Sequence, residues 1–311
     1  MILQPANTEQ LSQMLAAAFA KKEKVERVEL AALNRVLEYT PEDMTVTVEA
    51  GITLAALQAE LGRHRQWLPM DPPNLERVTI SEILNASLSG PRRFGYGTIR
   101  DYLIGITVLL ADGTTIHSGG KVVKNVAGYD LAKLFIGSHS SLGVTVAATF
   151  KLRPVPELEQ FVQAQCDSLE KADQLVEAVI QSAVTPVVLD LHKLSGSLAL
   201  TVVLGFAGTR EEVAWQMACA NELGFNQPSA LDYATEFWTK VAPAHRLSVL
   251  PSKMVTAIRG LNGAPFIARA GNGIIYHRGT ATPGTDELPL VLMRRLKEAY
   301  DPRHILPDVP L

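Results

Sequence analysis

The 311-residue sequence is poor in cysteine and has no glycine before Gly51. Its two cysteines, Cys166 and Cys219, form no C-x-x-C pair, which fits a reducing compartment and leaves this chain too few thiols for an iron–sulfur cluster. The net charge of −3 gives no basic footprint for nucleic acid. Apolar runs stay far below about 18 residues, and no basic start precedes an apolar core, so we expect neither a membrane span nor a signal peptide.

Common nucleotide and hydrolase motifs are also absent. The G-x-G-x-x-G of Rossmann domains, the glycine-rich Lys-Ser/Thr motif of P-loops and the H-E-x-x-H of zinc hydrolases do not occur. Residues 137–143, Gly-Ser-His-Ser-Ser-Leu-Gly, resemble a hydrolase elbow only superficially, because G-x-S-x-G is missing. We therefore set phosphoryl transfer aside, expect no metal site, and keep acyl transfer as a remote alternative.

The composition is that of a globular protein long enough for two domains, with 47% apolar and 20% charged residues. The segment Arg153-Pro-Val-Pro156 punctuates the chain, so we predict one domain over 1–155 and a second over 156–311. We predict an α+β fold class. In the second domain the pattern strand, helix, strand, strand, helix is the beginning of a ferredoxin-like unit, over residues 160–166, 169–181, 187–191, 197–206 and 209–223.

The first domain begins with a helix that Asn7 can cap, with Gln10 three residues later. An alternating strand and a short helix follow on either side of Gly51. A loop-like stretch rich in Gly, Pro and Ser comes next, and two buried strands close the domain. We place these elements, in that order, at residues 44–50, 54–61, 66–101, 103–110 and 143–152.

The most informative stretch is 119–131, Gly-Gly-Lys-Val-Val-Lys-Asn-Val-Ala-Gly-Tyr-Asp-Leu. Glycines placed between strand-like runs indicate tight turns or a backbone that a ligand approaches closely. Other segments precede it in a specific order: Leu68-Pro-Met-Asp-Pro-Pro73, Ser89-Gly-Pro-Arg-Arg93 and Tyr96-Gly-Thr-Ile-Arg-Asp101. Over about residues 44–155 this ordered set resembles the FAD-binding domain of the vanillyl-alcohol-oxidase or PCMH type, and within it the E-subunit family of bacterial glycolate oxidases.

The resemblance implies a two-part PCMH-type domain followed by a second α+β domain, with FAD bound non-covalently. Backbone N–H groups of glycine-rich loops hold the diphosphate in that fold, since oriented amides bind anions without side chains in the way. The positions that match the family's cofactor segments are Pro72, Pro73, Thr79, Ser81, Ser89, Gly90, Gly143, Val144 and Thr145. Arg100 is a further candidate, because Arg binds oxyanions well, although pairing with Asp101 is an equal alternative.

Substrate and metal positions are less clear. The family's H-x-G-D-G-N-x-H stretch corresponds here to Arg269-Ala-Gly-Asn-Gly-Ile-Ile-Tyr-His277. The first metal-binding His is an Arg and the Asp is missing, so the resemblance implies no metal. Arg269, His277 and Arg278 are weak substrate candidates, and no catalytic residue is assigned.

Four departures from the family bear on FAD. The glycine-rich loop after the first helix is absent from residues 21–37, and T-x-G-G reads Thr79-Ile-Ser-Glu82. The later G-S-x-G-T-L-G carries Ser140 at its second glycine, and the terminal N-P-G reads Leu306-Pro-Asp-Val-Pro310. Weak FAD binding, or none, therefore stays an open alternative.

Two hypotheses follow. In the first, the chain is an FAD-binding subunit that supports oxidation of a 2-hydroxy acid, glycolate to glyoxylate, with a sister flavin-containing catalytic subunit and an iron–sulfur subunit as partners. In the second, it is a flavin-free scaffold that kept the fold and lost the pocket. The expected location is the cytoplasm, with peripheral attachment to the inner membrane through partners as an open alternative.

Overall fold

The computed structural model describes the chain except for residues 121–130, 198, 240–243, 281–289 and 309–311. Most of the 119–131 motif, including Lys124, Asn125, Tyr129 and Asp130, lies outside the described residues. The chain divides into unit 1 (Met1–Ser89, Thr98–Val155 and Glu287–Leu311) and unit 2 (Gly90–Gly97 and Pro156–Asp286). The sequence groups 156–311 together, whereas the C-terminal segment lies in unit 1. Within the described ranges, no helix combines the length and apolar character needed to cross a membrane.

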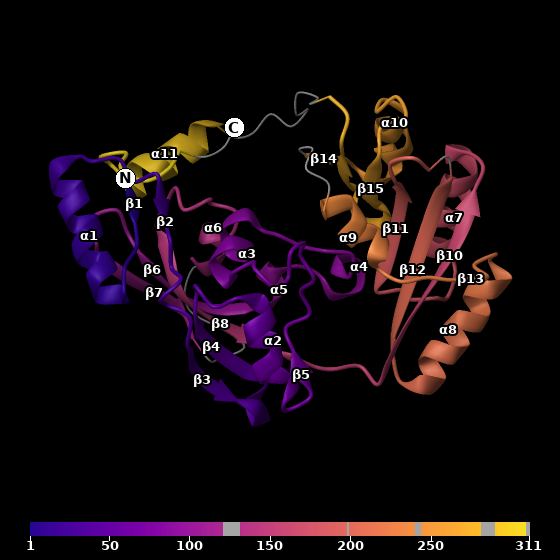
Figure 1. The fold of residues 1–311 in the computed structure, drawn as a ribbon, viewed down its shortest axis with the longest axis horizontal. Coiled ribbons are helices and arrows are strands. Elements are labelled where there is room, and N and C mark those ends of the chain that lie inside the picture. The colour runs from indigo at the N-terminus through magenta and orange to yellow at the C-terminus, as the bar shows by residue number, and fades with distance from the viewer. Residues whose placement is uncertain (121–130, 198, 240–243, 281–289, 309–311) are drawn as a thin grey trace. The chain divides into compact units, whose positions relative to one another are not determined.

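Unit 1 is built on an antiparallel five-stranded sheet (Figure 1). Its strand order is β3 (Val36–Thr40), β4 (Thr45–Glu49), β8 (Val144–Lys151), β6 (Leu103–Leu109) and β7 (Thr115–Gly119). One face of β8 is apolar along its whole length, from Val144 to Phe150, and packs against helices. The opposite face carries threonines such as Thr47 and Thr149, whose hydroxyl oxygens lie 2.9 Å apart.

Short helices cover the apolar face of this sheet. They are α2 (Leu54–Gly62), α3 (Ile80–Ala86), α5 (Ile99–Tyr102) and α6 (Ala132–Phe135). Helix α2 begins where Thr53 Oγ1 accepts a hydrogen bond from the Ala56 N–H, 3.2 Å away, as the sequence predicts. Two strand pairs complete the frame: β1 (Ile2–Leu3) with β2 (Arg27–Val28), and β5 (Gln66–Trp67) with β9 (Arg153–Pro154).

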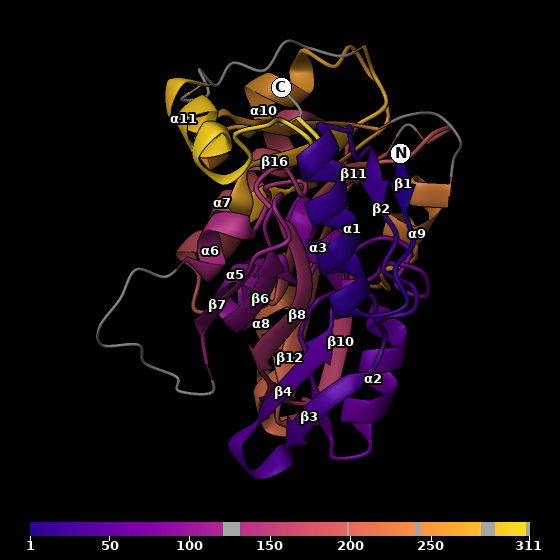
Figure 2. The same cartoon turned by 90° about the vertical axis from the view of Figure 1, so that its left-hand side faces the viewer.

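The predicted N-terminal helix is α1 (Thr8–Lys21), which lies beside β1 and β2 in Figures 1 and 2. Asn7 Oδ1 accepts a hydrogen bond from the Gln10 N–H at 2.8 Å, which confirms the predicted cap. The buried face of α1 packs in one apolar cluster with Val144 of β8, Ile305 and Leu306. The C-terminal segment that contains Ile305 follows α11 (Leu290–Tyr300).

Unit 2 contains a seven-stranded sheet. Its order is β13 (Gln227–Pro228), β10 (Leu158–Cys166), β12 (Leu200–Gly208), β11 (Val188–Lys193), β15 (Phe266–Arg269), β16 (Ile274–His277) and β14 (His245–Ser248). If β10, β11, β12 and β13 are numbered 1 to 4, their order in the sheet is 4-1-3-2. This order is typical of the ferredoxin-like fold, as the sequence predicts.

Helices lie on both faces of this sheet (Figure 1). One face packs against α7 (Leu169–Gln181), α8 (Arg210–Glu222) and α10 (Met254–Arg259), and the other packs against α9 (Asp232–Thr239). The one-turn helix α4 (Arg93–Tyr96) also belongs to unit 2, because Phe94 packs in its core and the Gly95 N–H donates to Val187 O at 3.1 Å.

Candidate cofactor site

A pocket of about 490 Å³ in unit 1 gathers four stretches of the chain that are far apart in sequence. It is lined by residues 26–31, by the start of α3, by the loop before β8 and by the C-terminal segment at Leu306 and Pro307. Three predicted cofactor positions, Thr79, Ser81 and Val144, line this pocket. The fold therefore brings together three of the positions that match the family's cofactor segments.

The other predicted cofactor positions lie outside the lining of this pocket. Pro72, Ser89, Gly90 and Thr145 are buried, and Pro73 is half-buried. Gly143 is buried so closely that a Cβ would meet Leu109 O at 2.9 Å. Arg100 is exposed and donates to Lys133 O at 3.3 Å. The structure does not gather these positions at the pocket.

The first wall runs from β2 directly into the segment 29–33. The Glu29 N–H donates to Leu3 O at 2.8 Å, and the Gly51 N–H donates to Leu33 O at 2.8 Å. A Cβ at Gly51 would lie 1.9 Å from Leu30 O, so the segment packs directly on the backbone there. Glycine is required at position 51 by this close approach.

The second wall is the start of α3, where Thr79 and Glu82 form a capping box. A Glu82 carboxylate oxygen accepts from the Thr79 N–H at 2.9 Å, and the Glu82 N–H donates to Thr79 Oγ1 at 3.2 Å. The next two amides are also used, because Ile80 N–H donates to Ile52 O at 3.0 Å and Ser81 N–H to Ala50 O at 2.7 Å. The first turn of α3 thus satisfies its amides within the protein.

The third wall is the loop 137–141. The Gly137 N–H donates to Leu84 O at 2.8 Å, the His139 N–H to Asn85 O at 3.0 Å and the Ser141 N–H to Ser138 O at 2.9 Å. His139 and Ser140 have φ values of 51° and 60°, in the left-handed region that favours glycine. Ser140 therefore keeps a backbone conformation suited to the glycine of the family motif.

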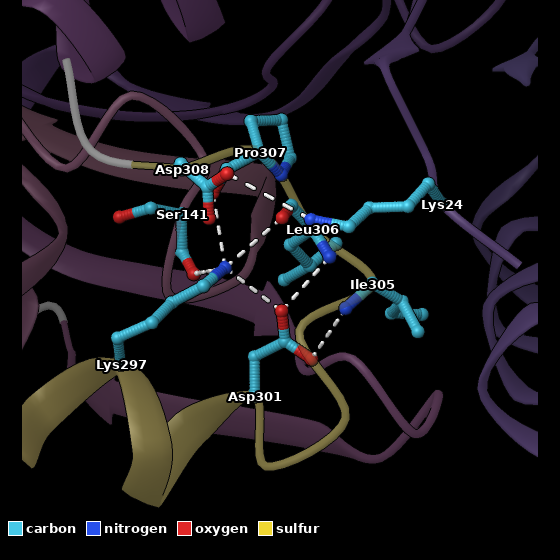
Figure 3. A network of polar contacts seen from close by, with 8 residues as sticks. All are labelled: Lys24, Ser141, Lys297, Asp301, Ile305, Leu306, Pro307 and Asp308. Carbon is cyan, nitrogen blue, oxygen red and sulfur yellow. Dashed lines mark hydrogen bonds and ion pairs between the residues drawn. The ribbon is translucent and has the colours of Figure 1, made fainter. Parts of the chain in front are cut away.

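The fourth wall is fixed by a buried ammonium group (Figure 3). Lys297 Nζ donates to Asp301 Oδ2 at 2.8 Å and to the carbonyl oxygens of Ser141, Leu306 and Pro307 at 2.9, 3.0 and 2.9 Å. The Asp301 carboxylate also accepts from the Ile305 N–H at 3.0 Å and from the Leu306 N–H at 2.8 Å. This network joins α11, the loop before β8 and the C-terminal segment. Sequence reasoning missed it, although Lys and Asp four residues apart were a visible signal.

The predicted substrate residues of unit 2 do not form one group. Arg269 forms an ion pair with Asp190 of β11, and both side chains are buried. The register pairs Phe266 with His277 and Arg269 with Ile274. Since paired residues share a face and neighbours alternate, Arg269 points to the α9 face and His277 to the opposite face. Arg278 shares the α9 face, where it donates to Phe237 O.

His192 lies on the same face of β11 as Asp190, and its ring stacks on Tyr233 with centroids 4.4 Å apart. Burial, with a smaller contribution from the Arg269 charge, lowers the pKa of His192 from 6.5 to about 4. The imidazole is therefore neutral in the folded protein at neutral pH.

This shifted pKa predicts a loss of stability in acid. Below pH 6.5 the unfolded chain binds a proton at His192, whereas the folded chain accepts this proton only near pH 4. The contribution of His192 to the free energy of unfolding is therefore fully present above pH 6.5 and is lost as the pH falls from 6.5 to 4. This difference in pKa between the unfolded and the folded chain corresponds to a loss of about 3 kcal/mol in the free energy of unfolding. Urea midpoints measured across this range should fall less in His192→Phe, whose ring can still stack on Tyr233. Equal slopes in both proteins would contradict the prediction.

Residues 15–119 match the model of a family described as an FAD binding domain. The glycolate oxidase subunit GlcD of Bacillus subtilis is 36% identical over 158 residues, which cover 51% of this chain and 34% of the relative. The glycolate oxidase subunit GlcE of Escherichia coli is 32% identical over 147 residues, covering 47% and 42%. A probable mitochondrial D-lactate dehydrogenase of Danio rerio is 30% identical over 211 residues, covering 62% and 42%.

Over the matched region the chain resembles the PCMH-type FAD-binding domain, as the sequence predicts. A solved structure with the same fold is an alkyldihydroxyacetonephosphate synthase, with a TM-score of 0.73, 16% identity, and coverage of 98% of this chain and 75% of that one. The predicted fold class and family are confirmed. The matched segments span less than half the length of each of these curated relatives.

FAD is the cofactor of this PCMH-type family, as the sequence predicts. The described pocket, however, does not fit the FAD diphosphate. The N–H groups of Thr79, Ile80 and Ser81 at the start of α3, and those of Gly137, His139 and Ser141 in the loop before β8, donate to acceptors within the protein. Three carboxylates, Glu26, Glu29 and Glu82, line the pocket against one guanidinium, Arg27. Burial lowers the pKa of the His139 imidazole, so this side chain adds no positive charge at neutral pH.

Proposed function

We propose that this chain is a subunit of an FAD-linked oxidoreductase that oxidises a 2-hydroxy acid, with glycolate to glyoxylate as the reaction. The observation that carries the proposal is the ordered set of family segments over about residues 44–155, together with the five-stranded sheet of unit 1 and the ferredoxin-like sheet of unit 2. Two relatives are named as glycolate oxidase subunits and another as a D-lactate dehydrogenase, and these names share a 2-hydroxy-acid substrate.

The partners in this proposal are a sister flavin-containing catalytic subunit and an iron–sulfur subunit. Electron transfer through an iron–sulfur subunit requires a separate chain, since this one has only two cysteines. We place the assembly in the cytoplasm, with attachment to the inner membrane through partner subunits.

The role of this chain within the assembly is to support rather than to perform the chemistry. Arg269, which the sequence offers as a carboxylate-binding residue, is buried and paired with Asp190 in unit 2. The charge of this guanidinium is compensated inside unit 2 by the Asp190 carboxylate. The second candidate function, a flavin-free scaffold subunit, is favoured by the internally satisfied amides at the start of α3.

Co-expression tests this proposal. The tagged chain is expressed with the flavin and iron–sulfur subunits of the same organism, and glycolate-dependent reduction of a dye is measured with and without it. We expect the three chains to co-purify, and activity to fall when this chain is omitted. Acetate, which lacks the hydroxyl group, serves as the substrate control. Full activity without this chain, together with no association, would contradict the proposal.

A further inference from the structure

We infer that this chain holds no FAD in the unit 1 pocket, and that any flavin of its assembly is bound by another chain. Binding of a diphosphate in a PCMH-type fold depends on backbone N–H groups that are free to donate. At the start of α3 the carboxylate of Glu82 and the carbonyl oxygens of Ile52 and Ala50 already accept from the N–H groups of Thr79, Ile80 and Ser81.

The start of α3 supports this inference most directly. FAD would have to displace Glu82 from the Thr79 N–H, where the carboxylate oxygen lies at 2.9 Å. It would also have to break the bond from Ser81 N–H to Ala50 O, which joins α3 to the segment after β4. Contacts of the diphosphate with the Thr79 and Ser81 amides would therefore cost the chain these two native hydrogen bonds.

The opposite wall lacks the glycine-rich loop of the family. Residues 26–31 pass from β2 onto the backbone of Gly51 with a contact that excludes even a Cβ. Residues 1–50 contain no glycine, so they cannot form a glycine-rich loop like that of the family. Glu26 and Glu29 add negative charge on this wall, and this charge repels the negatively charged diphosphate of FAD.

A second capping box in unit 2 shows that Glu82 acts as an ordinary helix cap. At the start of α8, Glu212 accepts from the Thr209 N–H at 2.8 Å, and the Glu212 N–H donates to Thr209 Oγ1 at 3.2 Å. The two boxes match closely in geometry, although Glu212 does not line the unit 1 pocket. In this chain, the segment that corresponds to T-x-G-G therefore forms a helix N-terminus whose capping residues hydrogen-bond to each other.

FAD binding by the full-length wild-type chain tests the inference. The chain is purified, its visible flavin absorbance is recorded, and its melting temperature is measured with and without saturating FAD. We expect a colourless protein with no shift, since a ligand that binds only the folded state would raise the midpoint by several degrees. A yellow protein that releases one FAD per chain, or a clear shift with FAD, would overturn the inference.

Two matched variants test the structural reason. Glu82→Gln removes the charge at the pocket and keeps an acceptor for the cap, and Glu212→Gln does the same in unit 2. We expect both variants to fold, to lose similar small amounts of thermal stability, and to remain unresponsive to FAD. A Glu82→Gln protein that FAD stabilises would overturn this structural reason, because it would show that the charge of Glu82, and not the use of the amides, excludes FAD. These readouts do not involve partner subunits, so their failure is distinct from failure of the proposed assembly.

Discussion

Lys297→Met is expected to lower the free energy of unfolding of unit 1 by about 3–5 kcal/mol. The side chain of Lys297 is 8% exposed and that of Asp301 is 0% exposed, so the substitution leaves a buried carboxylate without its counter-charge. The carbonyl oxygens of Ser141 and Leu306 lose the same donor. Urea unfolding followed by circular dichroism should show a lower midpoint with an unchanged slope.

Lys24→Met is the matched control for this prediction. Lys24 and Asp308 form an ion pair of 3.7 Å in the same region (Figure 3), but their side chains are 63% and 77% exposed. Water screens such a pair, so its removal should change the midpoint little. The double variant Lys297→Met/Asp301→Asn should lose less than the sum of its single variants, because the two groups interact. Equal effects of Lys297→Met and Lys24→Met would contradict the proposed role of the buried pair.

The regular elements of the fold could be predicted because their signals are local. Asn7 and Thr53 precede apolar-periodic segments and cap helices in the structure. The alternating segment 44–50 becomes β4, and the predicted strand–helix pattern after 156 becomes the ferredoxin-like order. Caps and periodicity act within a few residues, so the sequence alone is sufficient to place them.

The pocket could be predicted only in part. The sequence indicates which segments surround the FAD diphosphate, and three of their residues do line one pocket. The sequence shows Glu82 in place of the last glycine of T-x-G-G, and the structure uses its carboxylate to cap α3. The T-x-x-E signature was visible at Thr79, as it was at Thr209. Bonds to Ala50 and Leu84 were not visible, because they join segments that only the folded chain brings together.

The grouping of Arg269 with His277 shows a second limit. His277 comes eight positions after Arg269, and in an uninterrupted strand an even offset would place both side chains on one face. A turn at Ala270–Asn272 and Gly273 instead joins two antiparallel strands, and their register sets Arg269 opposite Ile274. A shift of that register by one residue would move each side chain to the other face of the sheet. The motif spacing does not contain this information.

Asp190→Asn is expected to destabilise unit 2 by about 3–5 kcal/mol. The substitution keeps the shape of the side chain, but it removes the negative charge that pairs with the buried Arg269 guanidinium. It also weakens the hydrogen bond from the Tyr233 hydroxyl to Asp190 Oδ2, which is 2.5 Å long. Thermal and urea unfolding should both report the loss.

Asp167→Asn is the matched control, since Asp167 forms an exposed ion pair with Lys171 at 2.6 Å and its removal should have little effect. Replacing both buried charges, as in Asp190→Leu/Arg269→Met, should recover much of the stability lost in Asp190→Asn, because no uncompensated charge stays buried. Should Arg269 instead bind a substrate carboxylate, Asp190→Asn would leave stability nearly unchanged and raise the KM of the assembly for glycolate. A loss of stability without that KM change identifies the pair as a structural element of the sheet.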